Sequence, residues 1–166
     1  MLEVAKPPDG TPVEEISGKI DISFRHTMGP YLERFFDEMR DNKKLMGIRC
    51  TGCGVVVLPP RSYCSFCYAP TGQWVELSDE GHIMTFTQVR APFPGQPVEP
   101  PYIYAFIMLD GADVHFPHII DEVDPAEVRI GMRVKAKWAE DRKGTLHDIE
   151  YFRPTSLSDR RKRAGV

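Results

Sequence analysis

Residues 49–68 read RCTGCGVVVLPPRSYCSFCY and contain all four cysteines of the 166-residue chain. The cysteines form two pairs, Cys50/Cys53 and Cys64/Cys67, and two residues separate the thiols within each pair. A C-x2-C turn directs two sulfurs at one point, and two such turns facing each other across a hairpin supply the tetrahedral thiolate set that Zn2+ accepts. The spacing therefore predicts one zinc ion held by four cysteines.

The sequence next to the cysteines fits two facing turns. Gly54 follows Cys53 and suits the left-handed backbone that often comes after the second ligand of such a turn, whereas Tyr68 holds the equivalent place after Cys67. The residues between the two pairs predict a short strand and then a reversal at two prolines. We therefore predict a zinc ribbon over residues 48–75.

Four protein ligands would close the coordination sphere of the metal, whereas a catalytic zinc keeps an open position for water. We therefore expect one structural Zn2+ per chain, and no thiol left over to act as a nucleophile. Four thiolates also suit iron, and two disulfides would use the same cysteines. Metal is favoured over disulfides because we expect a reducing, cytoplasmic setting.

That expectation rests on the start of the chain and on its composition. The first residues, MLEVAKPPDGTPVEE, lack the apolar run of a signal peptide and carry acids instead of bases. No stretch approaches the roughly 18 consecutive apolar residues of a membrane span, so we expect no membrane association. With 42% hydrophobic residues the chain can form a core without disulfides.

The two ends of the chain differ from the middle in composition. Residues 1–25 are rich in proline, glycine and acids and predict an arm, in which one apolar alternation would suit a short strand. Residues 154–166 predict a tail whose basic cluster is typical of a solvated terminus. The residues concerned are Ile16, Ile20, Ile22 and Phe24 in the arm and Arg160, Arg161, Lys162 and Arg163 in the tail.

Residues 26–47 predict one amphipathic helix. Apolar side chains recur there at intervals of three and four, Pro30 fits the first turn, and Gly47 lies just beyond the end. The apolar stripe would either pack on the chain's own core or contact a partner protein. The second interpretation points to Phe35 and Phe36, because they are large aromatic residues for so short a helix.

From Trp74 onward the hydrophobic pattern changes to a period of two. Five strand-like runs within residues 76–153 predict a small closed barrel, for which the five-stranded OB-fold is the candidate. The run 102–110 is apolar on both faces, so we expect it to be buried on both sides. The predicted fold class is mainly β with an N-terminal helix: a four-cysteine zinc ribbon followed by an OB-fold barrel. The runs are 83–90, 102–110, 113–120, 132–139 and 145–152.

A zinc ribbon beside an OB-fold is a combination found in nucleic-acid-binding proteins. A basic stripe in the fourth run, formed by Arg133, Lys135 and Lys137, supports that hypothesis. A tight turn after this run would place Lys137 opposite Asp148 and Lys135 opposite Glu150, which neutralises the stripe. The formal net charge is −3, and a zinc tetrathiolate would bring it to about −5, whereas nucleic-acid binders are typically basic. We therefore expect no nucleic-acid binding.

Catalysis by this chain alone is also not expected. The sequence contains no glycine-rich phosphate loop, no G-x-S-x-G motif and no convincing pair of carboxylates. His115 and His118 would point to opposite faces of a strand, so they do not suggest a second metal site. The sequence indicates a binding or structural protein.

The order of the parts resembles the acyl-CoA-associated zinc-ribbon/OB-fold family, whose members are small proteins encoded alongside thiolases. The residues that carry the resemblance are KLMGIRC, TGCG, LPPRSYC and SFC, followed by Gly81 opening GHIMTFTQV, a proline-rich loop, and IGMRV. It covers about residues 26–153, and the chain departs from it at Tyr68 and in residues 1–25. The resemblance implies a non-catalytic subunit in a hetero-oligomer with a thiolase or thiolase-like enzyme, whose acyl-CoA site it helps to shape.

The proline-rich loop of residues 91–101 is the predicted point of contact with that partner or with its acyl-CoA. It is too long for a tight hairpin turn, five prolines stiffen it, and Phe93 has no obvious place in the core. Arg90 lies at its base, and Arg61 on the ribbon is assigned to the same contact. The alternatives are a free-standing CoA- or nucleotide-binding module and a single-stranded nucleic-acid-binding protein.

Overall fold

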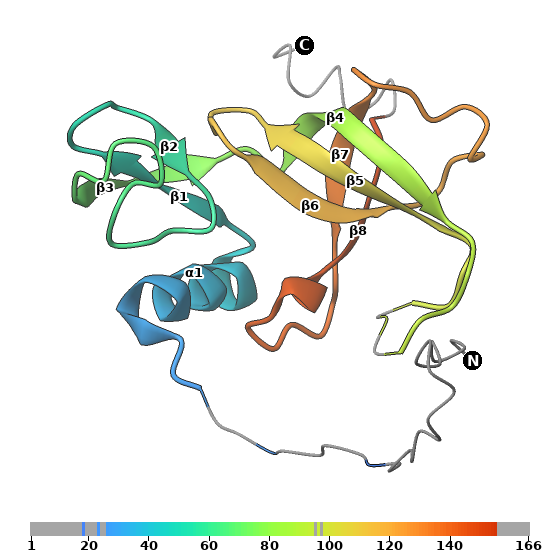
Figure 1. Cartoon of the computed structure of the whole chain (residues 1–166), viewed down its shortest axis with the longest axis horizontal. Coiled ribbons are helices and arrows are strands. Elements are labelled where there is room, and N and C mark those ends of the chain that lie inside the picture. The colour runs from blue at the N-terminus through green and yellow to red at the C-terminus, as the bar shows by residue number, and fades with distance from the viewer. Residues whose placement is uncertain (1–17, 19–22, 24–25, 95, 97, 156–166) are drawn as a thin grey trace, which may run out of the picture.

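The computed structural model describes residues 18, 23, 26–94, 96 and 98–155. Figure 1 shows a small sheet at one end of the molecule, a barrel beside it, and an α-helix below the small sheet. The short strand expected in residues 1–25 and the basic cluster of the tail lie outside the described residues. The predicted fold class is confirmed.

The small sheet has the order β2-β1-β3, and the barrel closes in the order β4-β5-β6-β8-β7. Both are antiparallel except where β6 meets β8. Five strands closed in this way form the expected OB-fold barrel. The elements are α1 Gly29–Asn42, β1 Leu45–Cys50, β2 Val56–Val57, β3 Thr71–Leu77, β4 Glu80–Val89, β5 Tyr102–Leu109, β6 His115–Ile120, β7 Arg133–Trp138, the short 3-10 helix η1 Leu146–Asp148, and β8 Ile149–Pro154.

The helix α1 is shorter than the sequence pattern predicted. It begins with Gly29 and Pro30 and ends at Asn42, because Lys43 adopts a left-handed backbone (φ 54°) and turns the chain away. Residues 45–47, assigned to the helix from the sequence, are instead the first buried residues of β1. The apolar run that looked like a last helical turn is therefore the start of the ribbon sheet.

The pairing of β7 with β8 also differs from the prediction. Lys137 lies opposite Tyr151 and Lys135 opposite Arg153, not opposite Asp148 and Glu150. The predicted tight turn is replaced by a longer connection that contains η1, so β8 begins only at Ile149.

Asp148 organises that longer connection instead of pairing across the sheet. Its side chain is buried, and its carboxylate accepts hydrogen bonds from the backbone N–H groups of Lys143 (2.8 Å) and Gly144 (2.9 Å). A carboxylate that satisfies two backbone donors stabilises the loop that surrounds it. The loop that closes around the Asp148 carboxylate thus accounts both for the burial of this side chain and for the register of β7 with β8.

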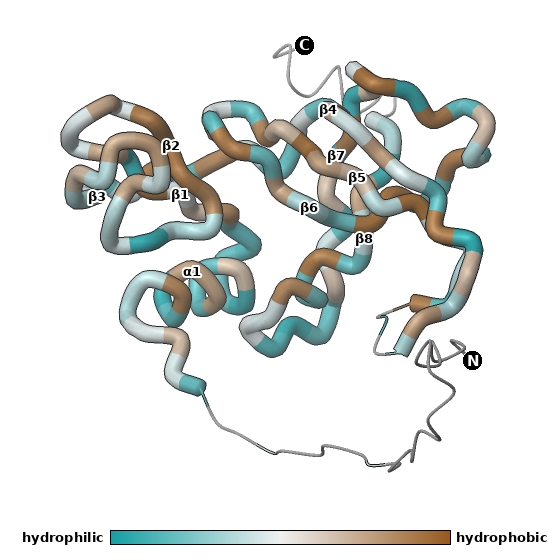
Figure 2. The backbone as a smooth tube through the Cα atoms, in the orientation of Figure 1, coloured by the Kyte–Doolittle hydropathy of each residue, from teal (hydrophilic) through white to brown (hydrophobic). Residues whose placement is uncertain are grey.

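Strand β5 is buried on one face only, which corrects the expectation of burial on both. Ile103, Ala105 and Ile107 point into the barrel, whereas Tyr104 and Phe106 are 38% and 44% exposed on its outer side. The hydrophobic stretches in Figure 2 therefore include side chains that face solvent as well as core.

Two contacts tie the parts of the molecule together. The guanidinium of Arg142, in the connection before β8, donates to the backbone carbonyl of Arg40 in the last turn of α1 (2.7 Å). On the other side, Asp113 of the barrel donates its N–H to the carbonyl of Val56 in β2 (3.1 Å) and accepts the N–H of Val56 on its carboxylate (2.8 Å). A buried cluster continues from α1 through β1 into the barrel, so the helix, ribbon and barrel share one core.

Candidate metal centre

The first cysteine pair lies where β1 ends. The N–H of Cys50 donates to the carbonyl of Val55 (2.8 Å), and the N–H of Gly54 returns to the carbonyl of Cys50 (3.2 Å). Gly54 has φ 76°, the left-handed conformation that its sequence position suggested. The chain therefore makes a closed turn with the side chains of Cys50 and Cys53 on its inside.

The second pair repeats this geometry. The N–H of Cys64 donates to the carbonyl of Ala69 (2.9 Å), and the N–H of Tyr68 donates to the carbonyl of Cys64 (3.1 Å). Tyr68 adopts φ 59°, a conformation that is uncommon for a residue with a side chain. The two turns are thus equivalent, with a tyrosine where the first turn has glycine.

The four thiols meet at one point. Their sulfur atoms all lie within 4.8 Å of one another, with Cys50 and Cys67 3.4 Å apart and Cys53 and Cys64 3.7 Å apart. These distances exclude disulfides, in which the sulfurs would be about 2.05 Å apart. Tetrahedral coordination with Zn–S bonds of about 2.3 Å separates the sulfurs by about 3.8 Å, so the set fits a zinc ion.

The electrostatics of the thiols also fit a cation. The backbone N–H groups of Cys53 and Gly52 point at the sulfur of Cys50 (3.4 and 3.3 Å) and lower its pKa to about 6. Although the N–H of Val55 acts to lower the pKa of Cys53, hydrogen bonds with the neighbouring thiols and burial raise it to about 12. Within this turn a thiolate is favoured at Cys50 and opposed at Cys53, and a bound cation would favour the thiolate at both.

The second turn favours a thiolate in the same manner. The backbone N–H groups of Cys67 and Phe66 lower the pKa of Cys64, and the Phe66 nitrogen lies 3.4 Å from the Cys64 sulfur. Cys50 and Cys64 are buried while Cys53 and Cys67 are exposed, so each turn supplies one inner and one outer ligand. Among the described residues, no further group of three or more metal-ligating side chains is gathered in this way.

The helix residues assigned to a partner contact differ from each other. Phe35 has no exposed surface and belongs to the core, so in this structure it presents no surface to a partner. The ring of Phe36 is partly buried and packs edge-on against Phe35, with centroids 5.3 Å apart. Of the two predicted contact residues on α1, only Phe36 keeps accessible surface.

The remaining predicted contact residues are exposed, but the structure does not bring them together. The guanidinium of Arg90 donates to Gln88 on the same strand (3.0 and 2.7 Å), and Phe93 is 52% exposed in the loop after β4. Arg61 is exposed on the ribbon. Figure 1 shows the ribbon and the loop after β4 at opposite ends of the molecule, so they cannot line one small pocket.

Two of the three basic residues of β7, Arg133 and Lys135, are neutralised, although not by β8. Lys135 pairs with Glu80 (3.3 Å) and Asp79 (3.8 Å), and Arg133 makes a two-pronged ion pair with Asp110 (2.7 Å for both contacts). The partners come from β4 and from the ends of its neighbours, on the opposite edge of β7 from the predicted one. Neutralisation of Lys135 was expected correctly, but its predicted partner Glu150 and the predicted pair of Lys137 with Asp148 are wrong.

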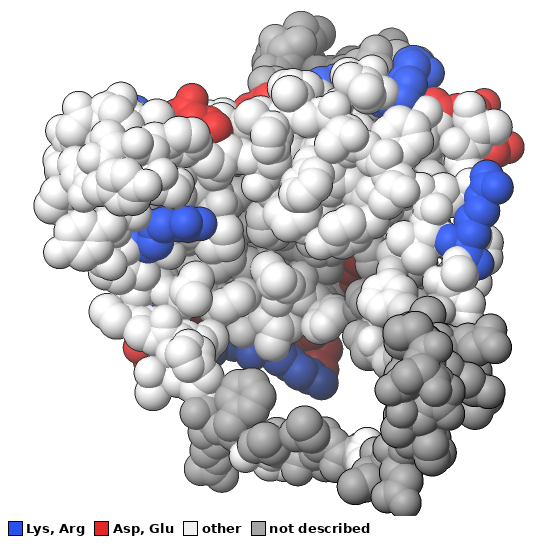
Figure 3. All heavy atoms as spheres, viewed as in Figure 1, with Lys and Arg blue, Asp and Glu red and all other residues white. Residues whose placement is uncertain are grey.

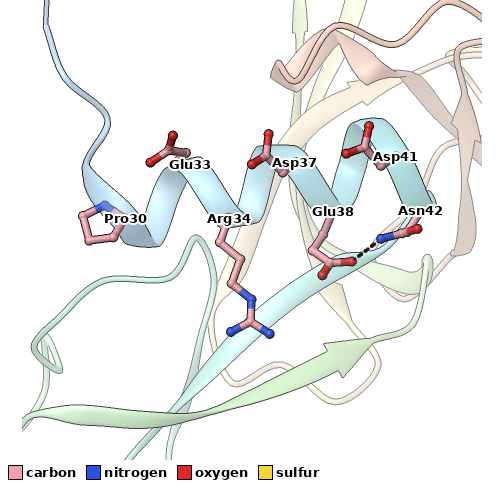
Figure 4. Close-up of a pocket in the computed structure, with 7 residues that line it drawn as sticks. All are labelled: Pro30, Glu33, Arg34, Asp37, Glu38, Asp41 and Asn42. Atoms are coloured by element: carbon pink, nitrogen blue, oxygen red, sulfur yellow. Dashed lines mark hydrogen bonds between the residues drawn. The ribbon is translucent and has the colours of Figure 1, made fainter.

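Sequence reasoning missed a cluster between α1 and the ribbon. The guanidinium of Arg34 lies 4.4 Å from the ring centre of Trp74, and the ring of Tyr31 stacks on Trp74 with centroids 6.1 Å apart. In Figure 4 Arg34 points from the helix toward the ribbon, whereas Glu33 and Asp37 point away from it. The spacing of Tyr31 and Arg34 by three residues was the available signal, since it places them on one helix face.

Comparison with known proteins identifies this arrangement. Two family models match the chain in order: the ChsH2 rubredoxin-like zinc ribbon domain over residues 38–71 and the ChsH2 C-terminal OB-fold domain over residues 74–139. A DUF35 domain-containing scaffold protein from Methanocaldococcus jannaschii is 31% identical over 104 residues, which are 62% of this chain and 73% of the relative. The chain belongs to the DUF35 family. A second DUF35 domain-containing scaffold protein, from Pyrococcus furiosus, is 29% identical over 104 residues, covering 63% of this chain and 75% of that relative.

Two solved structures share the DUF35 fold. One, named Ltp2-ChsH2(DUF35) aldolase, has a TM-score of 0.58 at 23% identity and covers 78% of this chain and 98% of that one. The other is a DUF35 protein of unknown function from Sulfolobus solfataricus, with a TM-score of 0.55 at 24% identity and coverage of 76% and 84%. The resemblance drawn from the sequence is confirmed, and the metal of this DUF35 ribbon is zinc. In the part of the chain that the structure describes, no helix has the length and apolar character of a membrane span.

Proposed function

We propose that this chain is a non-catalytic accessory subunit of a thiolase or thiolase-like enzyme that acts on acyl-CoA. It stabilises that enzyme and helps to shape its acyl-CoA site. Thiolase chemistry needs a nucleophilic cysteine, and all four cysteines here are gathered around one metal position. That single observation carries the proposal, because the chemistry must then come from a partner.

The comparisons support this proposal at a coarser level. The curated relatives are named scaffold proteins, and a solved structure of the same fold is named for an aldolase together with a DUF35 chain. Both names describe proteins that act with another component. Exposed apolar residues such as Tyr104 and Phe106, on the outside of the barrel, offer the kind of surface that an assembly would cover.

The test is co-purification from the native host with the tagged full-length, zinc-loaded chain as bait. The expected result is a thiolase-family enzyme at a fixed stoichiometry, identified by mass spectrometry, whose acyl-CoA activity falls when the bait is removed. An unrelated tagged zinc-ribbon protein serves as the control for capture through the metal. Absence of any thiolase-family enzyme from the specific eluate would reject the proposal.

A further inference from the structure

Three aromatic side chains project from the second cysteine turn. Tyr63 is 62% exposed, Phe66 61% and Tyr68 80%, and together we call them the ribbon tip. They lie within residues 63–68, a turn closed by hydrogen bonds from Cys64 to Ala69 and from Tyr68 to Cys64. None of the three takes part in the buried core cluster, so the fold of this chain does not require their apolar surface.

Apart from the cysteines, the surface around the ribbon tip has few charged side chains. Arg61 is the single charged residue in the sequence from 50 to 75, whereas 27% of the whole chain is charged. Figure 3 shows the ribbon end of the molecule as largely uncharged on the face in view. Aromatic residues with few charges among them are typical of the central part of a protein interface and not of ordinary solvated surface.

Tyr68 gives an independent indication that these side chains have a use. It has φ 59° at the position where the equivalent first turn has Gly54 at φ 76°. A side chain in this region is strained, and glycine would relieve the strain without changing the turn. A tyrosine that is strained and four-fifths exposed contributes nothing evident to the stability of its own chain.

The ribbon tip is also rigid and close to a net negative charge. Four thiolates around one Zn2+ carry a formal charge of −2, and two of the ligands, Cys53 and Cys67, are exposed beside the tip. Zinc and the turn hydrogen bonds fix the loop, so little conformational entropy is lost when it is covered. The complementary surface is therefore an apolar cleft that also presents basic side chains toward the sulfurs.

We propose that the ribbon tip inserts into such a cleft on the partner enzyme. This inference rests on the proposed function and assigns the part of the chain that makes the central contact. Tyr63, Phe66 and Tyr68 are its anchors, since buried aromatic residues supply most of the binding energy at such interfaces. Arg61 lies at the edge of the same loop and would contact the partner at the rim of this interface.

The test measures affinity between the full zinc-loaded chain and the thiolase-family enzyme that co-purifies with the wild type. Tyr68→Gly, Phe66→Ser and Tyr63→Ser are each expected to raise Kd at least about tenfold, as is usual for anchor residues. Tyr68→Gly removes backbone strain, so its melting temperature stays level or rises while its affinity falls. Each variant should still contain one zinc per chain. Weaker binding together with unimpaired stability is a result that a merely structural role would not give.

Ile130→Ser is the matched control, because Ile130 is 67% exposed but lies away from the ribbon, in the connection between β6 and β7. Its Kd should equal that of the wild type, and an equal loss in this control would overturn the assignment to the tip. Wild-type affinity in all three tip variants would overturn it as well, while leaving the proposed function intact. If the tip variants reduce self-association of the chain and not enzyme binding, the occupant is a second copy and the proposal fails. If no thiolase-family enzyme binds the wild-type chain, both the proposed accessory function and the assignment of the ribbon tip are rejected.

Discussion

His118 lies on the inner side of β6, between the rings of Phe116 and Phe152, at centroid distances of 5.8 and 5.5 Å. Its Nδ1 is buried without a hydrogen-bond partner, and its Nε2 lies 3.4 Å from the carbonyl oxygen of Leu146. Burial lowers the pKa of this imidazole below its usual 6.5, and the nearby His147 acts in the same direction. The folded protein therefore favours the neutral form of His118.

The direction of the resulting pH effect follows from that shift. Because protonation of His118 is easier in the unfolded chain, stability is fully present above about pH 6.5 and is lost as the pH falls below it, by at most about 1.4 kcal/mol per pH unit. We expect His118→Leu to flatten this dependence between pH 7 and 5, measured by urea unfolding. His115→Gln, an exposed neighbour on the same strand, should keep the wild-type slope. Identical slopes in wild type and His118→Leu would show that another group is responsible.

At the scale of elements, the ribbon and the barrel depend on different forces. The edge strand β2 of the ribbon has only two residues, and the ribbon loops expose most of their side chains. Such a segment is held by its metal because it buries too little apolar surface to fold alone. The barrel strands instead close on a continuous set of fully buried residues that includes Ile83, Ile107 and Phe152.

Cys67→Ser should therefore loosen the ribbon and not the barrel. We expect zinc content well below half an equivalent and, by hydrogen exchange, loss of protection mainly in residues 48–75, with the barrel strands still protected. A chelator applied to the wild type should give the same pattern. Ser65→Ala, in the same turn but without a ligand atom, should retain one zinc per chain. A ribbon that stays protected after the metal is lost would contradict this account.

The ribbon was predictable from the sequence because its geometry is local. Two residues between cysteines and a glycine after the pair determine a turn whatever the rest of the chain does, and Gly54 behaves as expected. The register of β7 with β8 was not predictable, because it depends on Asp148, which reads as a surface acid but is buried in its own loop. The prediction that both faces of β5 are buried was wrong at Phe106 for a related reason. Residue type alone does not distinguish a buried aromatic side chain from one that is exposed for binding.

At the scale of the whole molecule, the described part of the loop after β4 and the ribbon sheet lie at opposite ends, so the two can meet different parts of one partner (Figure 1). Phe93 is half exposed, and its N–H donates to the side chain of Gln96 (2.9 Å), which orders the turn without using the ring. Among the contacts described for it, Arg90 makes hydrogen bonds only to the partly buried Gln88 at the end of β4. Neither side chain supports the core.

We therefore expect Phe93→Ala and Arg90→Ala to weaken the complex or to raise its KM for acyl-CoA, while the melting temperature of this chain changes by no more than about 1 °C. Val98→Ala is the control, because Val98 is an exposed apolar residue of the same loop. Assembly is measured by titration and KM by steady-state kinetics of the complex. Wild-type values in both variants would remove the loop from the contact surface and leave Phe36 and the ribbon tip.

The contact between Asp113 and Val56 has a consequence for solubility. β2 stands at the edge of the ribbon sheet, and an edge strand offers unpaired backbone groups on which a strand from another molecule can grow. Asp113 occupies both the N–H and the carbonyl of Val56, with its carboxylate and its own N–H respectively. A single acidic residue from the barrel thereby closes this side of the ribbon sheet to aggregation by strand addition.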